Sequence, residues 1–439
     1  MSKLSRLFAL GTLLGLAACG GGSGGSGAGS GGTGGGGGGG GGTVVNSAPV
    51  TVDSGPAGLA VGPTGFAAVN ELYVTITVCA PGSTVNCQTI DHVQVDTGSV
   101  GLRIPVSVLN PSLLTALPMQ SDSSGNPVGE CFGFVDGYTF GSVRSADVQI
   151  AGEKVAGMPI QAIADTGVFS TVPTGCSSGG GTNLATIYDF GANGILGVGV
   201  TTTDCGPACT LPGGFGAATY YDCPSSGCAG IIGRNASAGA PFQQLPNFVA
   251  ALATDNNGLI IRLPSVPSGG QTSLAGTIVF GIGTQTDNAL AAATVLTTTG
   301  TFGPNGPGLI TVTYNGQTLT DSFIDSGSNG NFFDDNAIAR CTATNETGFY
   351  CPTAPLNLSA VLQGQNSVTA NASFVVDNAQ SLFTTSFSVL PGLAGASSSF
   401  AMPTLSSFDF GLPFFYARNV YVGIEGRAAG GATGPFIAF

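Results

Sequence analysis

The chain is poor in charged residues. Only 8% of its 439 residues are charged, with 10 Lys and Arg against 23 Asp and Glu, which gives a formal net charge of −13 at pH 7. Nucleic acid and anionic lipid head groups attract clusters of basic residues, and this chain offers few. The composition therefore excludes nucleic acid as an expected partner, and the pI of about 4.1 favours an acidic working environment.

Histidine is almost absent, with 1 in the whole chain. This residue, His92, lies beside Asp91, and we interpret it as a polar residue at a strand edge. A Ser-His-Asp triad also needs its serine on a sharp turn, and the Gly-x-Ser-x-Gly match at 21–25 belongs to a low-complexity segment. Nucleophilic catalysis of that kind is not expected.

A membrane-spanning hydrophobic run is also missing near the amino terminus. The apolar stretch 7–16 follows Lys3 and Arg6, and it is shorter than the ~20 residues that a spanning helix needs. Leu16-Ala17-Ala18-Cys19 resembles a bacterial lipobox, so residues 1–18 are predicted to be a lipoprotein signal peptide that is removed before acylation of Cys19. An uncleaved transmembrane anchor is the alternative.

Residues 19–43 consist almost only of Gly, with some Ser, Thr and Ala. Such a composition predicts a flexible tether between the lipid on Cys19 and a globular part. Gly20, rather than Asp, follows Cys19, which favours the outer membrane over retention at the inner one. We therefore expect a lipid-anchored protein of the bacterial envelope.

Eleven cysteines are present, and ten remain when Cys19 is set aside for acylation. An even number suits disulfides in an oxidising compartment. Local spacing favours the pairs Cys79 with Cys87 and Cys341 with Cys351, pairings among Cys205, Cys209, Cys223 and Cys228, and then Cys131 with Cys176. A zinc site is the alternative for the Cys205 to Cys228 cluster, but the predicted secretion and the single histidine argue against it.

After the tether, short β-branched or alternating runs are separated by Gly, Pro, Asn and Asp, which predicts a mostly β chain. The expected strands are 72–78, 93–95, 146–150, 259–263, 277–280, 309–314, 322–324 and 420–424. Short helices are expected at 242–253 and 335–340. A Pro-, Ser- and Gly-rich stretch at 264–273 is the expected hinge, which divides the chain into lobes 44–268 and 269–439.

Two tetrapeptides carry the candidate chemistry. The triplet Asp-[Ser/Thr]-Gly begins at Asp53, Asp96, Asp165 and Asp325, but only Asp96-Thr97-Gly98-Ser99 and Asp325-Ser326-Gly327-Ser328 add a hydroxyl at the fourth place and follow an apolar run. Two carboxylates on tight turns, held face to face by hydroxyls and amides, can share one proton and activate water. The alternative is a pair of ordinary turns that end strands.

Further motifs then appear in a recognisable order. In the first half these are the run 93–99 with Leu102 and Ile104, the run Tyr138-Thr139-Phe140-Gly141-Ser142, and the apolar-apolar-Gly segment at 194–199. The runs at 245–248 and 276–281 follow, and then Phe323-Ile324-Asp325-Ser326-Gly327-Ser328 and the closing runs 410–416 and 420–424. Together they resemble the pepsin family of aspartic peptidases, in a version that looks like an uncharacterised bacterial lipoprotein branch.

The resemblance implies a bilobal, mostly β fold with a central cleft and few short helices. It also implies an aspartic endopeptidase that hydrolyses peptide bonds at acidic pH with Asp96 and Asp325 as catalytic residues. Thr97, Gly98, Ser99, Ser326, Gly327 and Ser328 would support the catalytic loops, and Tyr138 would cover a peptide or protein substrate from a flap hairpin. No metal or organic cofactor is implied, and two lobes in one chain make a monomer sufficient.

Two departures from the family pattern affect the flap, and a third concerns a prosegment. Arg103 stands where an aromatic usually supports the flap tyrosine, Thr139 stands where glycine is more usual, and no Lys or Arg lies between Arg6 and Arg103 to form a basic prosegment. Arg103 is therefore a candidate flap or substrate residue, with an exposed charge at a strand end as the alternative. For the whole protein the alternatives are a catalytically silent pepsin-like binding module on the envelope, or a purely structural β-rich envelope protein.

Overall fold

The computed structural model describes residues 46–59, 67–135, 137–178, 181–206, 219–231, 244–301, 306–344, 346–399 and 407–439. Strands dominate, and the helices are short. The predicted mostly β fold is confirmed. The amino-terminal signal and tether assignments, 1–18 and 19–43 with Cys19, lie outside the described residues. None of the described helices is long and apolar enough to cross a membrane.

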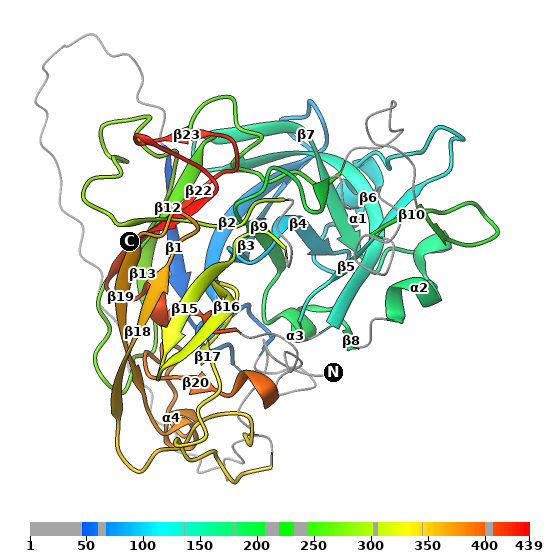
Figure 1. Ribbon diagram of the computed structural model, residues 1–439. Coiled ribbons are helices and arrows are strands. Elements are labelled where there is room, and N and C mark those ends of the chain that lie inside the picture. The colour runs from blue at the N-terminus through cyan, green and yellow to red at the C-terminus, as the bar shows by residue number, and fades with distance from the viewer. Residues whose placement is uncertain are drawn as a thin grey trace, which may run out of the picture.

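Six strands form an antiparallel layer, which is drawn mainly in the upper left of Figure 1. Their order is β1 (Ser47–Val52), β13 (Leu274–Phe280), β12 (Gly258–Leu263), β22 (Arg418–Gly423), β25 (Phe436–Ala438) and β14 (Val295–Thr297). Strands from both ends of the chain therefore meet in one layer. The stretch 264–273, expected as a hinge, connects β12 to β13, which pair directly with each other.

On one side of this layer lie the elements of the first half, drawn in blue to green in Figure 1. Its strands are β2 (Leu72–Cys79), β3 (Cys87–Asp96), β4 (Val100–Pro105), β5 (Val128–Gly133), β6 (Gly137–Ile150), β7 (Glu153–Ile163), β8 (Thr182–Asn183), β9 (Gly194–Val198), β10 (Tyr220–Asp222) and β11 (Ala229–Gly230). Its helices are α1 (Pro111–Ala116), the 3-10 turn η2 (Gly167–Phe169), α2 (Thr174–Ser177) and α3 (Ile187–Phe190).

The elements of the second half, in yellow to orange, lie in the lower left of the view (Figure 1). They are β15 (Ile310–Tyr314), β16 (Gln317–Ile324), β17 (Asn331–Phe332), β18 (Leu356–Gln363), β19 (Thr369–Val376), α4 (Ala379–Phe383), β20 (Ala394–Gly395), η5 (Ser397–Ser399), β21 (Asp409–Phe410) and η6 (Leu412–Phe415). The second half also contains the small antiparallel pair β23 (Ala428–Ala429) and β24 (Ala432–Thr433).

The two halves repeat one arrangement. In the first, β3 pairs in parallel with β9, which pairs antiparallel with β4 on its other side. In the second, β16 pairs in parallel with β21, which pairs antiparallel with β17. Each half thus holds the strand that precedes a candidate catalytic loop against a short buried strand from much later in the sequence.

The predicted strands are confirmed, but both predicted helices are wrong. The described part of 242–253 is a series of turns, because the Asn247 side chain donates to the carbonyls of Gly199 and Thr201 and accepts from the Val249 amide. In 335–340, the Asp335 carboxylate accepts from the Ala337 amide. Side chains that take up backbone groups in this way compete with helix formation.

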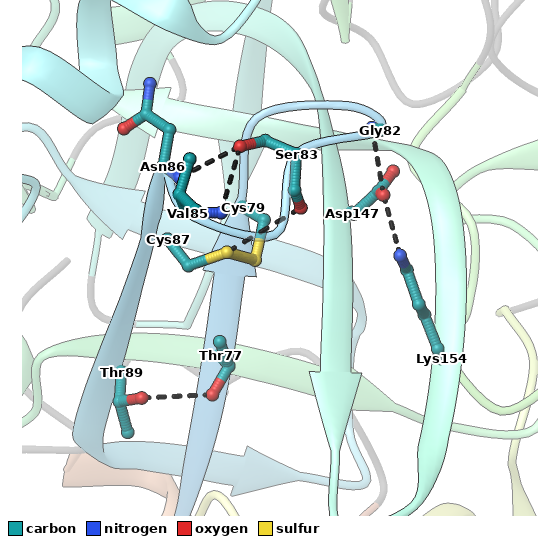
Figure 2. Close-up of a disulfide and its surroundings, with 10 residues drawn as sticks. All are labelled: Thr77, Cys79, Gly82, Ser83, Val85, Asn86, Cys87, Thr89, Asp147 and Lys154. Carbon is teal, nitrogen blue, oxygen red and sulfur yellow. Dashed lines mark hydrogen bonds and ion pairs between the residues drawn. A yellow bond between two sulfur atoms is a disulfide. The ribbon is translucent and has the colours of Figure 1, made fainter.

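The predicted disulfides are largely confirmed. Cys79–Cys87, Cys131–Cys176, Cys223–Cys228 and Cys341–Cys351 are bonded, and Cys205 is also in a disulfide, while Cys209 lies outside the described residues. Figure 2 shows Cys79–Cys87 closing the turn between β2 and β3, where the Ser83 hydroxyl accepts from the Asn86 amide.

Candidate active site

Asp96 is the last residue of β3, and its carboxylate is held by its own loop. The Gly98 amide donates to Asp96 Oδ1 at 2.8 Å, and the Ser99 hydroxyl donates to Asp96 Oδ2. Behind the loop, Gly197 of β9 pairs with Asp96. A carboxylate that accepts two such bonds is fixed in orientation, and it is only 6% exposed.

Asp325 follows β16 and repeats this arrangement in the second half. The Gly327 amide donates to Asp325 Oδ1 at 2.8 Å, and the Ser328 hydroxyl lies 3.2 Å from Asp325 Oδ2. The Asp325 amide donates to the carbonyl of Phe410, at the end of β21. The two tetrapeptides therefore adopt the same turn, as their shared pattern predicts.

Hydrogen bonds join the two loops directly. The Thr97 hydroxyl donates to the Ile324 carbonyl and accepts from the Ser326 amide, and the Ser326 hydroxyl donates to the Val95 carbonyl at 2.7 Å. The Thr97 amide in turn donates to Ser326 Oγ at 3.2 Å. All of these groups are buried, so the bonds fix how the loops lie against each other.

The two carboxyl groups face each other across these loops. A Cβ built on Gly98 would lie 2.7 Å from the Asp325 carboxyl carbon, and one built on Gly327 would lie 2.6 Å from Asp96 Oδ1. Each carboxyl therefore touches the backbone of the opposite loop, an approach that only glycine allows. The sequence pattern required this small residue, and the structure gives the reason.

The electrostatics of Asp325 follow from this arrangement. Burial, repulsion from Asp96 and Asp409, and hydrogen bonding with Asp96 raise the pKa of Asp325 well above its usual value, against the opposing effect of the Gly327 amide. Two adjacent carboxyls cannot both ionise at low cost. The arrangement can hold one acid and one base side by side.

A third buried carboxyl, that of Asp409, was missed by the sequence reasoning. The Ser328 hydroxyl lies 2.6 Å from Asp409 Oδ2, and the side chain is 1% exposed. Burial raises the pKa of Asp409 well above its usual value, and so does Asp96, while the hydrogen bond with Ser328 lowers it. Its signal in the sequence was an acid two positions before Gly411, where the first half has Ile195 before Gly197.

Gln94 and Glu71 were missed as well. The Gln94 side chain donates to Glu71 Oε2 and to the Gly327 carbonyl at 3.2 Å, so the second loop is bound from β3. Next to Glu71, the Asn70 side chain donates to the Asn329 carbonyl at 2.8 Å. A polar residue two places before Asp96 inside a buried strand was the available signal.

Tyr138 lies near the start of β6, on the predicted β5–β6 hairpin. It pairs with Gly133 of β5 and with Asn183 of β8, and its carbonyl accepts from the Leu184 amide at 2.8 Å. Its partly buried side chain packs against the cluster that contains the Cys131–Cys176 disulfide. The hairpin therefore exists, and the covering role of Tyr138 remains a prediction.

Arg103 is not an exposed charge at a strand end, so that alternative is wrong. Its side chain is 0% exposed, lies 2.7 Å from Glu130 Oε1 and 3.6 Å from Asp204 Oδ2, and covers the Phe132 ring at 3.7 Å. A guanidinium is charged at every relevant pH, so burial requires such partners. Arg103 thus supports β5 from inside the protein.

The ion pairs among the described residues lie elsewhere than at the three carboxyls. Within the described ranges, no ion pair reaches Asp96, Asp325 or Asp409, and no cluster of His, Cys, Asp and Glu suits a metal ion. Asp53 and Asp165, which head the other two triplets, pair instead with His92 and Arg144. The structure therefore brings Asp96 and Asp325 together, whereas Asp53 and Asp165 form ion pairs elsewhere.

Comparison with known proteins agrees with this geometry. A family model described as "Protein of unknown function (DUF3443)" matches residues 42–439. No curated protein matches the sequence. Among solved structures, the crystal structure of an aspartic proteinase from Irpex lacteus is similar, with 14% sequence identity, a TM-score of 0.50, and coverage of 89% of this chain and 96% of that chain. At this identity the likeness shows the pepsin-like fold alone.

Proposed function

For a chain that belongs to the family described as "Protein of unknown function (DUF3443)", we propose the function of an aspartic endopeptidase. Asp96 and Asp325 are its catalytic residues, and its substrates are peptides or unfolded proteins. The observation that carries the proposal is the contact of each carboxyl with the glycine of the opposite loop. Two ordinary strand-ending turns have no need of this contact.

In the proposed reaction the two carboxyls share one proton. The ionised member takes a proton from a water molecule as it attacks the peptide carbonyl, and the protonated member donates a hydrogen bond to the carbonyl oxygen, where negative charge develops. The C–N bond then breaks as the proton taken from water passes to the leaving amine, and the two carboxyls are left with one proton between them again. The bonds between Thr97 and Ser326 keep the two loops in place while charge moves between the acids.

Substrate positioning is assigned to the β5–β6 hairpin. Tyr138 would cover the substrate, and Arg103 would act indirectly, because its guanidinium supports Phe132 of the same hairpin from within. Lipid anchorage at Cys19 and an outer-membrane location are part of the proposal and rest on the lipobox pattern and the Gly-rich tether. The expected partners are thus a peptide and, through the lipid, a membrane.

The decisive test is cleavage of an unfolded protein from pH 3 to 7 with and without a statine-type transition-state mimic. Asp96→Asn and Asp325→Asn should each lower the rate by at least about 100-fold, since general acid-base catalysis contributes 10²- to 10⁴-fold. Asp53→Asn is a matched control, because Asp53 heads the same kind of triplet but pairs with His92.

We expect Asp53→Asn to keep the rate within about twofold of the unmodified chain, since a substitution away from the site leaves the reacting atoms in place. Circular dichroism serves as the check that each variant is folded. A folded chain that cleaves nothing and does not bind the mimic contradicts the proposal. The binding-module alternative would then account for the intact loops.

A further inference from the structure

We propose that Asp409 is a positioning residue of this site, whose proton directs the Ser328 hydroxyl toward Asp325. The inference rests on the proposed function for its effect on turnover. The hydrogen-bond arrangement itself does not depend on turnover. Asp409 does not touch the reacting atoms in this role, because it acts through Ser328.

The Ser328 hydroxyl lies near two carboxyl oxygens but has only one proton to donate. Ser328 Oγ lies 2.6 Å from Asp409 Oδ2 and 3.2 Å from Asp325 Oδ2. If Asp409 is ionised, the shorter bond takes that proton, and Asp325 loses its donor. If Asp409 is protonated, it donates to Ser328 Oγ, and Ser328 donates to Asp325.

The first half of the molecule shows what the second half has changed. There, the Ser99 hydroxyl donates to Asp96. The pairing of β3 with β9 places Leu196 opposite Val95, and the pairing of β16 with β21 places Phe410 opposite Ile324, so Asp409 corresponds to the buried Ile195. An apolar residue in one half is thus an acid in the other, directly behind the catalytic loop.

The surroundings of Asp409 favour its neutral form. Phe323 of β16 and Phe332 of β17 pair with it, and the titratable groups that face it are Asp96 and Asp325 from the two loops. Its Oδ1 is buried, and no group in the described residues bonds to it. An ionised carboxylate with one unpartnered oxygen beside two other acids is costly, and a neutral acid costs much less.

Two states of the site follow. With Asp409 protonated, the chain of donors runs from Asp409 through Ser328 to Asp325, and the three acids carry two protons and one negative charge. When Asp409 releases its proton to solvent at higher pH, the Ser328 hydroxyl turns to Asp409 and a second negative charge enters the site. We expect turnover to fall at this point, since Asp325 is then no longer held on its outer oxygen.

The pH profile of kcat for Asp409→Asn tests this arrangement. The asparagine amide can donate to Ser328 Oγ as the protonated acid does, but it cannot ionise. We expect activity within about threefold of the unmodified chain at acidic pH and an alkaline limb shifted upward by about one pH unit. An unchanged limb overturns the proposal. A downward shift of both limbs also does, because it means that Asp409 was an ionised acceptor whose charge had raised the pKa of the pair.

Ser328→Ala separates the hydroxyl from the charge. Adding Asp409→Asn to Ser328→Ala should move the alkaline limb by much less than it does alone, because the hydroxyl that connects the two acids is gone. An equal shift in both backgrounds overturns the role of Ser328. A purely structural Asp409 would change stability and leave the pH profile in place.

A second readout remains available if the chain cleaves nothing. The slope of unfolding free energy against pH counts the protons that the folded state holds in excess. Asp409→Asn should lower that count by about one between pH 4 and 7, measured by urea unfolding at several pH values. If Asp409→Asn keeps the full slope of unfolding free energy against pH, Asp409 is not protonated in the folded state and the proposal is overturned. If the slope is reduced but the unmodified chain cleaves nothing, only the proposed function is rejected.

Discussion

At the scale of single residues, the hydroxyl of Thr97 tests how the two loops are joined. Thr97→Val keeps the shape of the side chain but removes the donor to Ile324 and the acceptor for the Ser326 amide, both of them buried. A buried N–H without an acceptor costs about 1–3 kcal/mol, so the free energy of unfolding should fall by that amount in urea titrations.

Thr77→Val is the matched control for this substitution. The Thr77 hydroxyl pairs with that of Thr89 at the surface of β2 and β3 (Figure 2), and its loss should change stability by less than about 0.5 kcal/mol. Equal effects at Thr97 and Thr77 would mean that the bonds between the loops add nothing to the fold.

Single residues also mark the limit of the sequence reasoning. Asp96 and Asp325 could be selected because the fourth hydroxyl separates them from Asp53 and Asp165, and the structure brings together the selected pair. Asp409 and the buried ion pair of Arg103 could not be found in this way. Their partners, Ser328 and Glu130, lie far away in sequence, so the acid two positions before Gly411 marks a residue but does not reveal its contact.

At the scale of elements, a disulfide should stabilise the fold more when the loop that it closes is longer. Cys131–Cys176 joins β5 to α2 across 45 residues, and Cys79–Cys87 closes 8 residues between β2 and β3. Loop-closure entropy assigns about 4 kcal/mol to the first and about 2.5 kcal/mol to the second. Double Cys→Ser variants should follow this order in chemical denaturation.

The reverse order would show that strand pairing already restricts these loops in the unfolded chain.

The elements themselves were predictable where the pattern is local, since alternating runs gave the positions of β2, β12, β13 and β22. The two expected helices failed because Asn247 and Asp335 bind backbone groups with their side chains. Helical composition is a weaker influence than such bonds in a short segment.

At the scale of the whole molecule, we expect maximal stability at mildly acidic pH. Burial, together with repulsion by and hydrogen bonding with Asp255, raises the pKa of Glu153 to about 7. The folded state keeps this proton where the unfolded chain has released it, so stability is fully present below pH of about 4.5 and is lost as the pH rises to about 7. Asp53 and Asp147 act in the opposite sense, because their lowered pKa values remove stability at low pH.

Glu153→Gln tests this expectation, because the amide keeps a donor toward Asp255 and cannot titrate. Its melting temperature should change less between pH 4.5 and 7 than that of the unmodified chain, as followed by scanning calorimetry. Asp287→Asn, at an exposed carboxyl, is the control and should keep the original profile. A Glu153→Gln profile that matches this control would contradict the raised pKa of Glu153.

The sequence by itself determined the strand-rich composition, the disulfide pairs of short spacing and the two Asp-[Thr/Ser]-Gly-Ser loops, because each of these is written in neighbouring residues. Only the tertiary structure decided which acids meet, since the pairing of β16 with β21 brings Asp409 to Ser328 and the contact between the loops sets Gly98 against Asp325. Burial then raises the pKa values of Asp325 and Asp409, and burial is a property of the packed molecule rather than of any segment.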